Sequence, residues 1–347
     1  MKKLLALLLF PAIVSSQNQH DYKNLVLEGG GIRGLAYAGV FFVFEEKGIL
    51  QNIEKVAGTS AGSIAGLMVS IGYNATEIDS VMMDLRIQRF NDGNGGVVGK
   101  YRRVRRGFGI YKGKVFEKWL QGLVDHKTGN PLLTFEELHQ LHLKNNFYKD
   151  FYCTGTNLSK QRLEIFSYQH TPEMPLALAV RISSGIPFYF EPVVLDDQLK
   201  KIQKSDTVSF VNYYVDGGML SNYPISIFDT CEDGNSNPLL CSNVKFCKQT
   251  IGIKMERPQQ IDSTGNNRVV IPAYEISKLS EYVSAFSNLL MESLSRKYPG
   301  LENEKGRTIY VSQGNISSKI RKTKQSEKMM LYNNGVQAAY AFFNGAR

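Results

Sequence analysis

The chain has 347 residues, of which 43% are hydrophobic and 21% charged, and its formal net charge at pH 7 is +9. This composition is that of an ordinary globular protein, and the length allows one large α/β domain or two small ones. The excess of positive charge favours an anionic partner, either a nucleic acid or a lipid surface.

The N-terminal stretch MKKLLALLLFPAIVSS has the pattern of an export signal. Two lysines precede an apolar run from Leu4 to Val14, and the small residues Ser15 and Ser16 offer a cleavage point. An apolar run of this length is short for a membrane span. We therefore expect a signal peptide over residues 1–16 and an exported protein that is periplasmic, outer-membrane-associated or secreted. The alternative is a buried first helix.

Short apolar strands and helices alternate along the first part of the chain. We expect a strand at 25–27, a helix at 35–48, a strand at 54–60, and helices at 61–73 and 74–86. Strands that alternate with helices predict a parallel sheet covered by helices, which is an α/β fold. Residues 90–112 are rich in glycine and arginine and predict a long loop.

The same order continues toward the C-terminus. A capping box at Thr134 and Glu137 begins one of the expected helices, and another helix ends before Pro187. Strands are expected at 150–158, 161–168, 211–220, 249–255 and 307–313, and helices at 114–124, 134–141, 171–185, 273–298 and 326–345. Surface loops are expected at 196–208, 231–249 and 257–268. No linker divides the chain, so we expect a single domain over residues 17–347.

Four cysteines constrain the chemistry. Cys153 lies in an apolar segment and is expected in a buried strand, whereas Cys231, Cys241 and Cys247 lie in a polar segment. In an exported protein, one disulfide among these three is expected. A zinc site is disfavoured, because no histidine lies nearby and the spacing lacks paired C-x-x-C motifs.

Two glycine motifs follow the first two strands. Gly29, Gly31 and Gly34 have the spacing of a dinucleotide-binding loop, but the second strand lacks the acidic residue that would bind a ribose. That strand instead enters the Gly-x-Ser-x-Gly motif at residues 58–62, which places Ser60 on a strand-to-helix turn. If these strands are parallel neighbours, Ser60 faces backbone N–H groups that can hold an oxyanion. The alternative is a tight turn with a capping serine.

A serine nucleophile needs a base, and the histidines do not supply one. His20 is next to the signal, His126 and His170 are expected in turns, and His139 and His142 on the solvated face of a helix. No histidine occurs after His170, which excludes the Ser–acid–His order of the α/β-hydrolases.

A carboxylate is the remaining candidate for the base. Asp216 ends an apolar strand and precedes Gly217 and Gly218, which places it at the expected functional edge of the sheet. The alternative is an aspartate in an ordinary Asp-Gly turn.

Taken in order, the motifs resemble those of the patatin-like phospholipases. They are GGGIRG at residues 29–34, GTSAG at 58–62, RISSGIPFYFEPV at 181–193 and DGG at 216–218, followed by Asn222 and Pro224. The resemblance covers the core motifs over residues 23–228 and extends only loosely over 229–347. Glu28 stands where the family often has aspartate, and because the carboxylate is kept we expect little effect.

The resemblance implies a three-layer α/β/α sandwich with a central, mostly parallel sheet. It also implies a Ser–Asp dyad, in which Ser60 is the nucleophile, Asp216 is the base, and Gly29, Gly30, Gly31 and Arg33 form or order the oxyanion hole. The implied activity is lipid acyl hydrolysis of phospholipase A type. Apart from the resemblance, the sequence shows no cluster of calcium ligands, so we expect no metal or other cofactor. An aspartate of ordinary pKa is a weak base, so we expect Asp216 to be buried.

The densest basic cluster contains Lys100, Arg102, Arg103, Arg105 and Arg106. For an exported protein, we expect phospholipid headgroups rather than nucleic acid as the partner of these arginines; a solvated basic loop is the alternative. For the function, the alternatives are a thioesterase, protease or general carboxylesterase with the same dyad, and a non-catalytic lipid-binding protein.

Overall fold

The computed structural model describes residues 21–202, 210–232, 237–241, 243–264, 306–314 and 323–345, together with a few isolated positions between them. The expected signal peptide lies outside the described residues, and so does the expected helix at 273–298 apart from single positions. Among the helices that the structure describes, none is long and apolar enough to cross a membrane.

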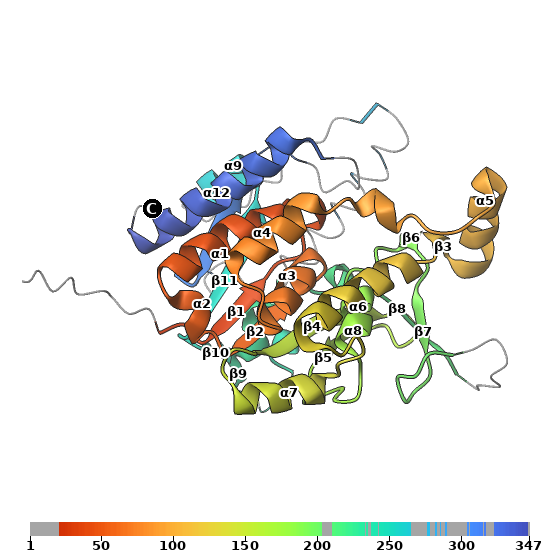
Figure 1. Ribbon diagram of the computed structural model, residues 1–347, viewed down its shortest axis with the longest axis horizontal. Helices are drawn as coiled ribbons and strands as arrows, with labels where there is room; N and C mark the ends of the chain where they lie inside the picture. Colours follow the sequence, from red (N-terminus) through yellow and green to blue (C-terminus); the bar gives the residue numbers. More distant parts are fainter. Residues whose placement is uncertain are drawn as a thin grey trace, which may run out of the picture.

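A central sheet of eight strands organises the molecule (Figure 1). Its strands follow the order β12-β11-β1-β2-β4-β8-β7, and β5 pairs with β4. The parallel strands are β1 (Asn24–Leu27), β2 (Lys55–Gly58), β4 (Asp150–Asn157), β11 (Thr250–Glu256) and β12 (Thr308–Ser312). The antiparallel strands are β5 (Arg162–Phe166), β7 (Val193–Leu195) and β8 (Asn212–Asp216). The expected α/β fold with a mostly parallel sheet is confirmed.

The two faces of the sheet carry different layers. Side chains alternate between faces along a strand, so Leu25 and Leu27 join one hydrophobic core and Val26 joins the other. The larger core is covered by α1 (Ala36–Glu46), α3 (Ala61–Ser70), α4 (Ala75–Asp84), α6 (Lys114–Thr128), α7 (Phe135–Lys144), α8 (Leu176–Ser183) and α12 (Gln325–Phe343). The smaller core is covered by the short 3-10 helices η4 (Ile225–Phe228) and η5 (Pro238–Leu240).

Three segments that the sequence predicts as loops contain regular structure. Residues 96–107 form helix α5 (Gly96–Gly107), which Figure 1 shows projecting from the sandwich. Its Arg103 donates hydrogen bonds to the carbonyl oxygens of Ile110 and Asn94, both at 2.7 Å, and so ties the helix to both flanking segments. The other two predicted loops contain helix α9 (Pro258–Thr264) and the paired strands β9 (Thr230–Cys231) and β10 (Val244–Lys245).

The expected disulfide joins Cys231 to Cys241, with their Cα atoms 6.0 Å apart. Cys247 is not paired in a disulfide, and Asn24 Nδ2 donates a hydrogen bond to its Sγ at 3.3 Å. Cys153 is a free thiol in the buried strand β4, as expected.

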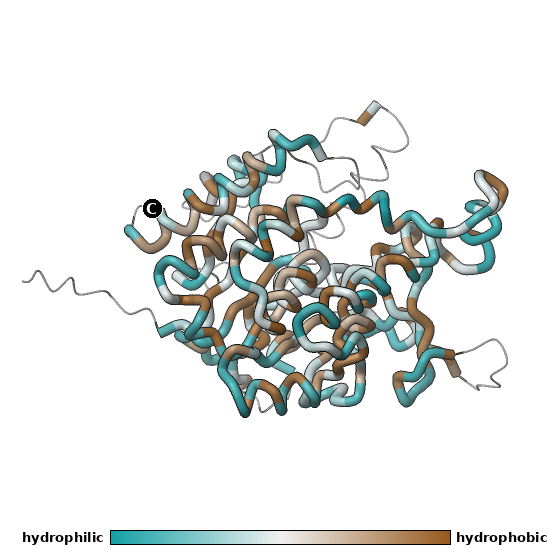
Figure 2. Tube along the Cα trace, viewed as in Figure 1, coloured by the Kyte–Doolittle hydropathy of each residue, from teal (hydrophilic) through white to brown (hydrophobic). Residues whose placement is uncertain are grey.

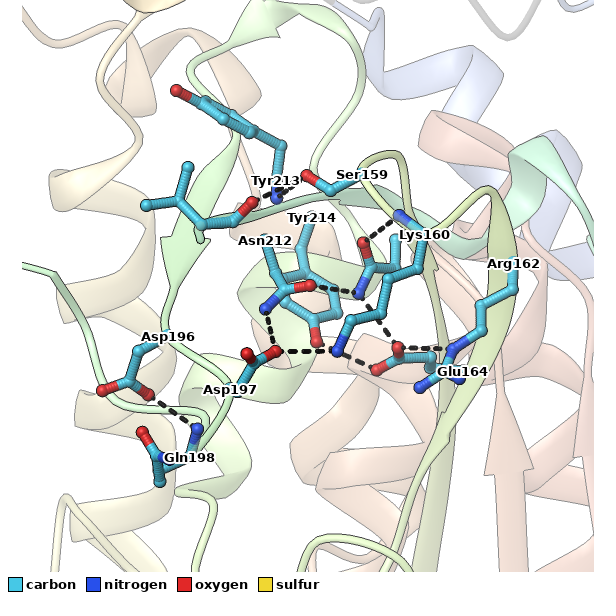
Figure 3. A network of polar contacts seen from close by, with 12 residues as sticks. Ser159, Lys160, Arg162, Glu164, Asp196, Asp197, Gln198, Asn212, Tyr213 and Tyr214 are labelled. Atoms are coloured by element: carbon cyan, nitrogen blue, oxygen red, sulfur yellow. Dashed lines mark hydrogen bonds and ion pairs between the residues drawn. The ribbon is translucent and has the colours of Figure 1, made fainter. Parts of the chain in front are cut away.

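A polar network fixes strand β8 against the β4–β5 hairpin (Figure 3). Asn157 of β4 donates from Nδ2 to Glu164 of β5 at 3.0 Å and to Asn212 of β8 at 3.1 Å. Asn212 in turn donates to Asp197 at 3.0 Å, and Lys160 pairs with the same carboxylate at 2.8 Å. Because β8 ends at Asp216, these contacts also hold that residue in register.

Candidate active site

Ser60 lies on a strained turn between β2 and α3. Its φ is 52° and its ψ is −121°, a combination that only a closely packed turn holds in a residue with a side chain. The flanking glycines are required by space: a Cβ on Gly58 would lie 2.3 Å from the Gly62 carbonyl oxygen, and one on Gly62 would lie 2.4 Å from that of Leu27. The Gly-x-Ser-x-Gly motif therefore encodes a turn that presents Ser60 at the end of the sheet.

Asp216 reaches Ser60 because of how three strands meet. Cys153 of β4 pairs with Gly58 of β2 on one side and with Phe166 of β5 on the other, whereas Gly155 pairs with Asp216 of β8 and with β5. Strands β2 and β8 therefore approach each other end to end along the same edge of β4. Asp216 ends an apolar strand as expected, but that strand, β8, runs antiparallel to β4 and does not belong to the parallel part of the sheet. β4 extends beyond the end of β2, and β8 pairs with that extension.

The two side chains are in direct contact. Ser60 Oγ donates a hydrogen bond to Asp216 Oδ2 at 2.8 Å, and the N–H of Gly218 donates to Asp216 Oδ1 at 2.8 Å. Asp216 is buried, and burial raises its pKa to about 7, although the hydrogen bonds from Gly218 and Ser60 act in the opposite direction. The burial that the sequence reasoning required is present, and it gives a carboxylate matched to proton transfer near neutral pH.

The triple-glycine loop borders Ser60, and its members differ in their bonding. The N–H of Gly29 is used, since it donates to the Asn222 carbonyl oxygen at 2.9 Å. Among the described residues, none accepts a hydrogen bond from the N–H of Gly30 or Gly31. Gly31 has a φ of 55°, which glycine adopts without strain. The N–H groups of Gly30 and Gly31 are thus available to donate to a bound oxyanion, whereas the N–H of Gly29 fixes the loop to Asn222.

Arg33 and Glu28 hold the two ends of this loop. Arg33 Nε donates to the Gly30 carbonyl oxygen at 2.9 Å, and its Nη1 donates to Gln313, the residue directly after β12. Glu28 Oε2 accepts from the Met255 N–H at 2.7 Å. Burial raises the pKa of Glu28 to about 7 against the effect of nearby Lys254.

Asn222 extends this support across the loop. Its Nδ2 donates to the Gly29 carbonyl oxygen at 2.9 Å and to Glu28 Oε1 at 3.3 Å. A Cβ on Gly29 would lie 2.2 Å from Asn222 Oδ1 and 3.1 Å from Ser60 Cβ. The loop, Asn222 and the serine are therefore packed in mutual contact.

Sequence reasoning missed two serines that support the nucleophile. The Ser60 N–H donates to Ser183 Oγ at 3.1 Å, and Ser184 Oγ donates to the Ser60 carbonyl oxygen at 3.0 Å. Ser183 is the last residue of helix α8 and Ser184 directly follows it, so the end of this helix packs against the turn. Their only sequence signal was their place in the RISSG segment, which carried a family resemblance but no assigned contact.

The histidines occupy other places. His126 lies in the last turn of helix α6 rather than in the connecting turn expected, and His170 lies in a turn, as expected, where it contacts Ser167. His139 is half-buried instead of solvated: its Nδ1 is 2.8 Å from Asp150 Oδ1, and its ring stacks on Tyr168 at 3.8 Å. Its partners come from strand β4 and the segment after β5, so the contact depends on tertiary packing that helix periodicity does not reveal.

A cavity of about 340 Å³ opens onto Ser60. Its wall is mostly apolar and includes Ile32, Leu35, Ile64, Met82, Phe90, Phe116, Ile186 and Phe190. Gly31 and Ser60 both line it, so an oxygen held near Ser60 in the cavity would lie beside Gly31. Arg86, Lys324 and Lys328 supply the charged part of the wall. The cavity suits a substrate with a long apolar part and an anionic group.

Comparison with known proteins identifies this arrangement. The family model described as patatin-like phospholipase matches residues 25–229, a range that contains the glycine loop, Ser60 and Asp216. The chain belongs to the patatin-like phospholipase family. The resemblance drawn from the motifs is thereby confirmed.

Several relatives support the same placement. The chain is 32% identical over 212 residues to the uncharacterized protein YqhO of Bacillus subtilis, covering 60% of this chain and 67% of that protein. It is 27% identical over 213 residues to a probable lipid hydrolase, 463L, of Invertebrate iridescent virus 6, covering 59% of this chain and 63% of that protein. The chain therefore spans about two thirds of the length of each of these relatives. The fold resembles that of VipD from Legionella pneumophila, with a TM-score of 0.56 at 16% identity, covering 94% of this chain and 67% of that chain.

Proposed function

We propose that this patatin-like protein is a lipid acyl hydrolase of phospholipase A type that uses Ser60 as nucleophile and Asp216 as general base. The observation that carries the proposal is the 2.8 Å hydrogen bond from Ser60 Oγ to the buried Asp216 carboxylate. Two further features support it: the N–H groups of Gly30 and Gly31, for which no described residue is an acceptor, and an apolar cavity that opens onto the serine.

The proposed reaction proceeds in two halves. Asp216 Oδ2 accepts the proton of Ser60 as Oγ attacks the ester carbonyl carbon, and the N–H groups of Gly30 and Gly31 hold the tetrahedral oxyanion. The intermediate collapses, the alcohol leaves with the proton from Asp216, and the acyl group remains on Ser60. Asp216 then takes a proton from water as that water attacks the acyl carbon. The second intermediate releases the fatty acid, and Ser60 Oγ recovers its proton.

The lipid substrate is supported by the cavity and by the relatives. The apolar wall accommodates an acyl chain, and the cationic residues Arg86, Lys324 and Lys328 suit a phosphate-bearing headgroup. One relative is described as a probable lipid hydrolase, and others as lysophospholipases of the NTE1 type. Anionic headgroup contact through arginines near residue 100 and export by an N-terminal signal are parts of the same proposal.

A panel of substrates tests the proposal. Hydrolysis of phosphatidylcholine, phosphatidylethanolamine, phosphatidylglycerol and lysophosphatidylcholine would be measured beside a short-chain ester and a thioester. We expect release of fatty acid from at least one phospholipid by the intact protein, and none by Ser60→Ala or Asp216→Ala. His170→Ala is the matched control, because His170 is a possible base by residue type but lies in an exposed turn. Cleavage of the soluble ester alone would favour the carboxylesterase alternative.

A further inference from the structure

Helix α5 contacts the rest of the protein through an unusual face. None of its residues is buried, and its partly covered positions, Gly99, Arg103 and Gly107, recur every four residues along one side. The glycines permit close approach: a Cβ on Gly99 would lie 2.2 Å from the Asn94 carbonyl oxygen, and one on Gly107 would lie 2.7 Å from the Glu191 carboxylate. The inward side is thus formed by two glycines and one arginine, with no apolar side chain.

The apolar side chains of α5, and that of Phe108 directly after it, are exposed, although the Phe108 ring also lies 5.8 Å from that of Tyr213. The exposed fractions are 83% for Val97, 79% for Val98, 68% for Tyr101, 40% for Val104 and 51% for Phe108. Val97, Tyr101 and Val104 have the spacing of a stripe along one face of the helix, whereas Phe108 follows the helix with a φ of 60°. Phe188 adds apolar surface near the end of the helix. It is 72% exposed, and it pairs with Gly109, two residues after α5. Apolar surface of this extent marks an interaction site.

Basic residues flank the stripe. Lys100, Arg102, Arg105 and Arg106 are exposed, and the segment Gly96–Gly107 contains no acidic residue. Arg103 has a different role, since its guanidinium donates to the backbone carbonyls of Ile110 and Asn94. Figure 2 shows hydrophobic and hydrophilic residues side by side on this projecting helix. A helix with an apolar face and a basic polar face is the pattern of an interfacial membrane helix.

Short segments connect α5 to the wall of the cavity on both sides. The 3-10 helix η2 (Ile87–Phe90) precedes it, and strand β3 (Gly109–Tyr111) follows it and pairs with β6 (Phe188–Phe190). Phe90 and Phe190, at the ends of these segments, both line the cavity beside Ser60. The buried Arg181 donates to the Glu191 carbonyl oxygen at 2.8 Å and to the Gly113 carbonyl oxygen at 3.2 Å. These bonds hold the segment after β3 to the segment after β6.

We propose that α5 is an interfacial helix that docks the protein on an anionic phospholipid bilayer. Its stripe of Val97, Tyr101 and Val104 enters the acyl region, while Lys100, Arg102, Arg105 and Arg106 contact lipid phosphates. Charge complementarity selects this occupant: a bilayer offers an apolar interior below a layer of negative charge, which matches a stripe flanked by cations. The inference rests on the proposed lipid substrate, because docking here brings the cavity to the lipid.

Vesicle co-sedimentation of the Ser60→Ala protein tests this proposal without hydrolysis. Binding would be compared between vesicles of phosphatidylcholine mixed with phosphatidylglycerol and vesicles of phosphatidylcholine alone. At low salt, Arg102→Gln/Arg106→Gln should weaken binding to the anionic vesicles about thirty-fold, and Val97→Ser/Tyr101→Ser about tenfold or more. The matched controls are Lys118→Gln/Lys144→Gln and Leu132→Ser/Leu143→Ser, which remove the same exposed charge or apolar surface elsewhere. These controls should bind normally.

The outcomes separate this inference from the proposed function. Equal vesicle binding by the α5 variants and the controls would overturn the inference. That result would leave the proposed function standing, because phospholipid hydrolysis is measured separately with the intact protein. Loss of binding in both α5 variants would support it even if no lipid of the panel were cleaved. Sedimentation velocity of the same variants tests a second copy as occupant: a change in oligomeric state with unchanged vesicle binding would contradict the proposal.

Discussion

The surroundings of Ser60 and helix α5 are opposites in construction. Around Ser60, backbone and side chains are buried, and the serine's N–H, hydroxyl and carbonyl each have hydrogen-bond partners. On α5, no side chain is buried, and Arg103 supplies the side-chain hydrogen bonds to neighbouring backbone. The first region holds reacting groups in fixed positions, and the second presents surface to something outside the protein. Rigidity and exposure are thus assigned to separate parts of one chain.

The largest expected effect concerns the buried region. Ser60→Ala and Asp216→Asn should each lower kcat/KM on a soluble ester by about 10⁴-fold or more, because each removes a partner in the proposed proton transfer. Double substitution at Arg102 and Arg106 on α5 should change this rate less than about threefold, since these side chains lie outside the cavity lining. Steady-state kinetics checks both, with circular dichroism as the control for folding. A rate for Asp216→Asn near that of the intact protein would contradict the proposed base.

The next effect tests how tightly the nucleophile turn is packed. Gly62→Ala should reduce the free energy of unfolding by about 3 kcal/mol, because the new Cβ meets two backbone carbonyl oxygens that cannot move independently of the sheet. The matched control is Gly122→Ala in helix α6, where a Cβ meets nothing within 4 Å. The free energy of unfolding of this control should rise by about 0.5–1 kcal/mol, because alanine favours a helix more than glycine does. Equal effects in urea titrations would mean that the turn is less constrained than its geometry indicates.

Burial of Asp216 should cost stability. Its folded-state pKa of about 7 lies above the ordinary value of 3.8, so between these pH values the folded protein holds a proton that the unfolded chain has lost. Proton binding by Asp216 therefore favours the folded state at low pH, and this stabilisation is lost as pH rises through 7. Asp216→Asn should raise the free energy of unfolding at pH 8 by about 1–4 kcal/mol, and the gain should shrink toward pH 4. A loss of stability at pH 8 would show that the ionised carboxylate is well stabilised.

The same pKa sets a smaller effect on rate. The base must be ionised, so kcat/KM on a soluble ester should fall about tenfold per pH unit below an apparent pKa near 7 and level off above it. Asp216→Glu is the matched variant, because it keeps a carboxylate at the position. A profile with an apparent pKa near 4 would mean that Asp216 is solvated in the working protein.

Much of this site follows from local sequence, because tight turns impose local requirements. The glycines at 58 and 62 and the apolar strands around them predict the turn, and the lack of a histidine after residue 170 points to a carboxylate. The direction of β8 could not be predicted, since an aspartate at the end of an apolar strand fits either direction. It is set by pairing with the far end of β4.

Helix α5 shows the opposite case. Glycines at 96, 99 and 107 each disfavour a helix by about 1 kcal/mol, and they led to the prediction of a loop. Two of them instead permit contact with Asn94 and Glu191, and Arg103 bonds to backbone on either side. The contact with Glu191 is tertiary, and the others depend on the path of the segments that flank the helix, so composition and periodicity did not reveal them. Similarly, the contact of His139 with Asp150 depends on how α7 packs on the sheet.

The most direct test of the proposed dyad is covalent labelling with a fluorophosphonate, followed by peptide mass mapping. The account predicts one phosphonylated residue, Ser60, labelled at a rate that rises with pH through about 7 and is abolished by Asp216→Asn. A label on another serine, or labelling of Ser60 at an unchanged rate in Asp216→Asn, would contradict it.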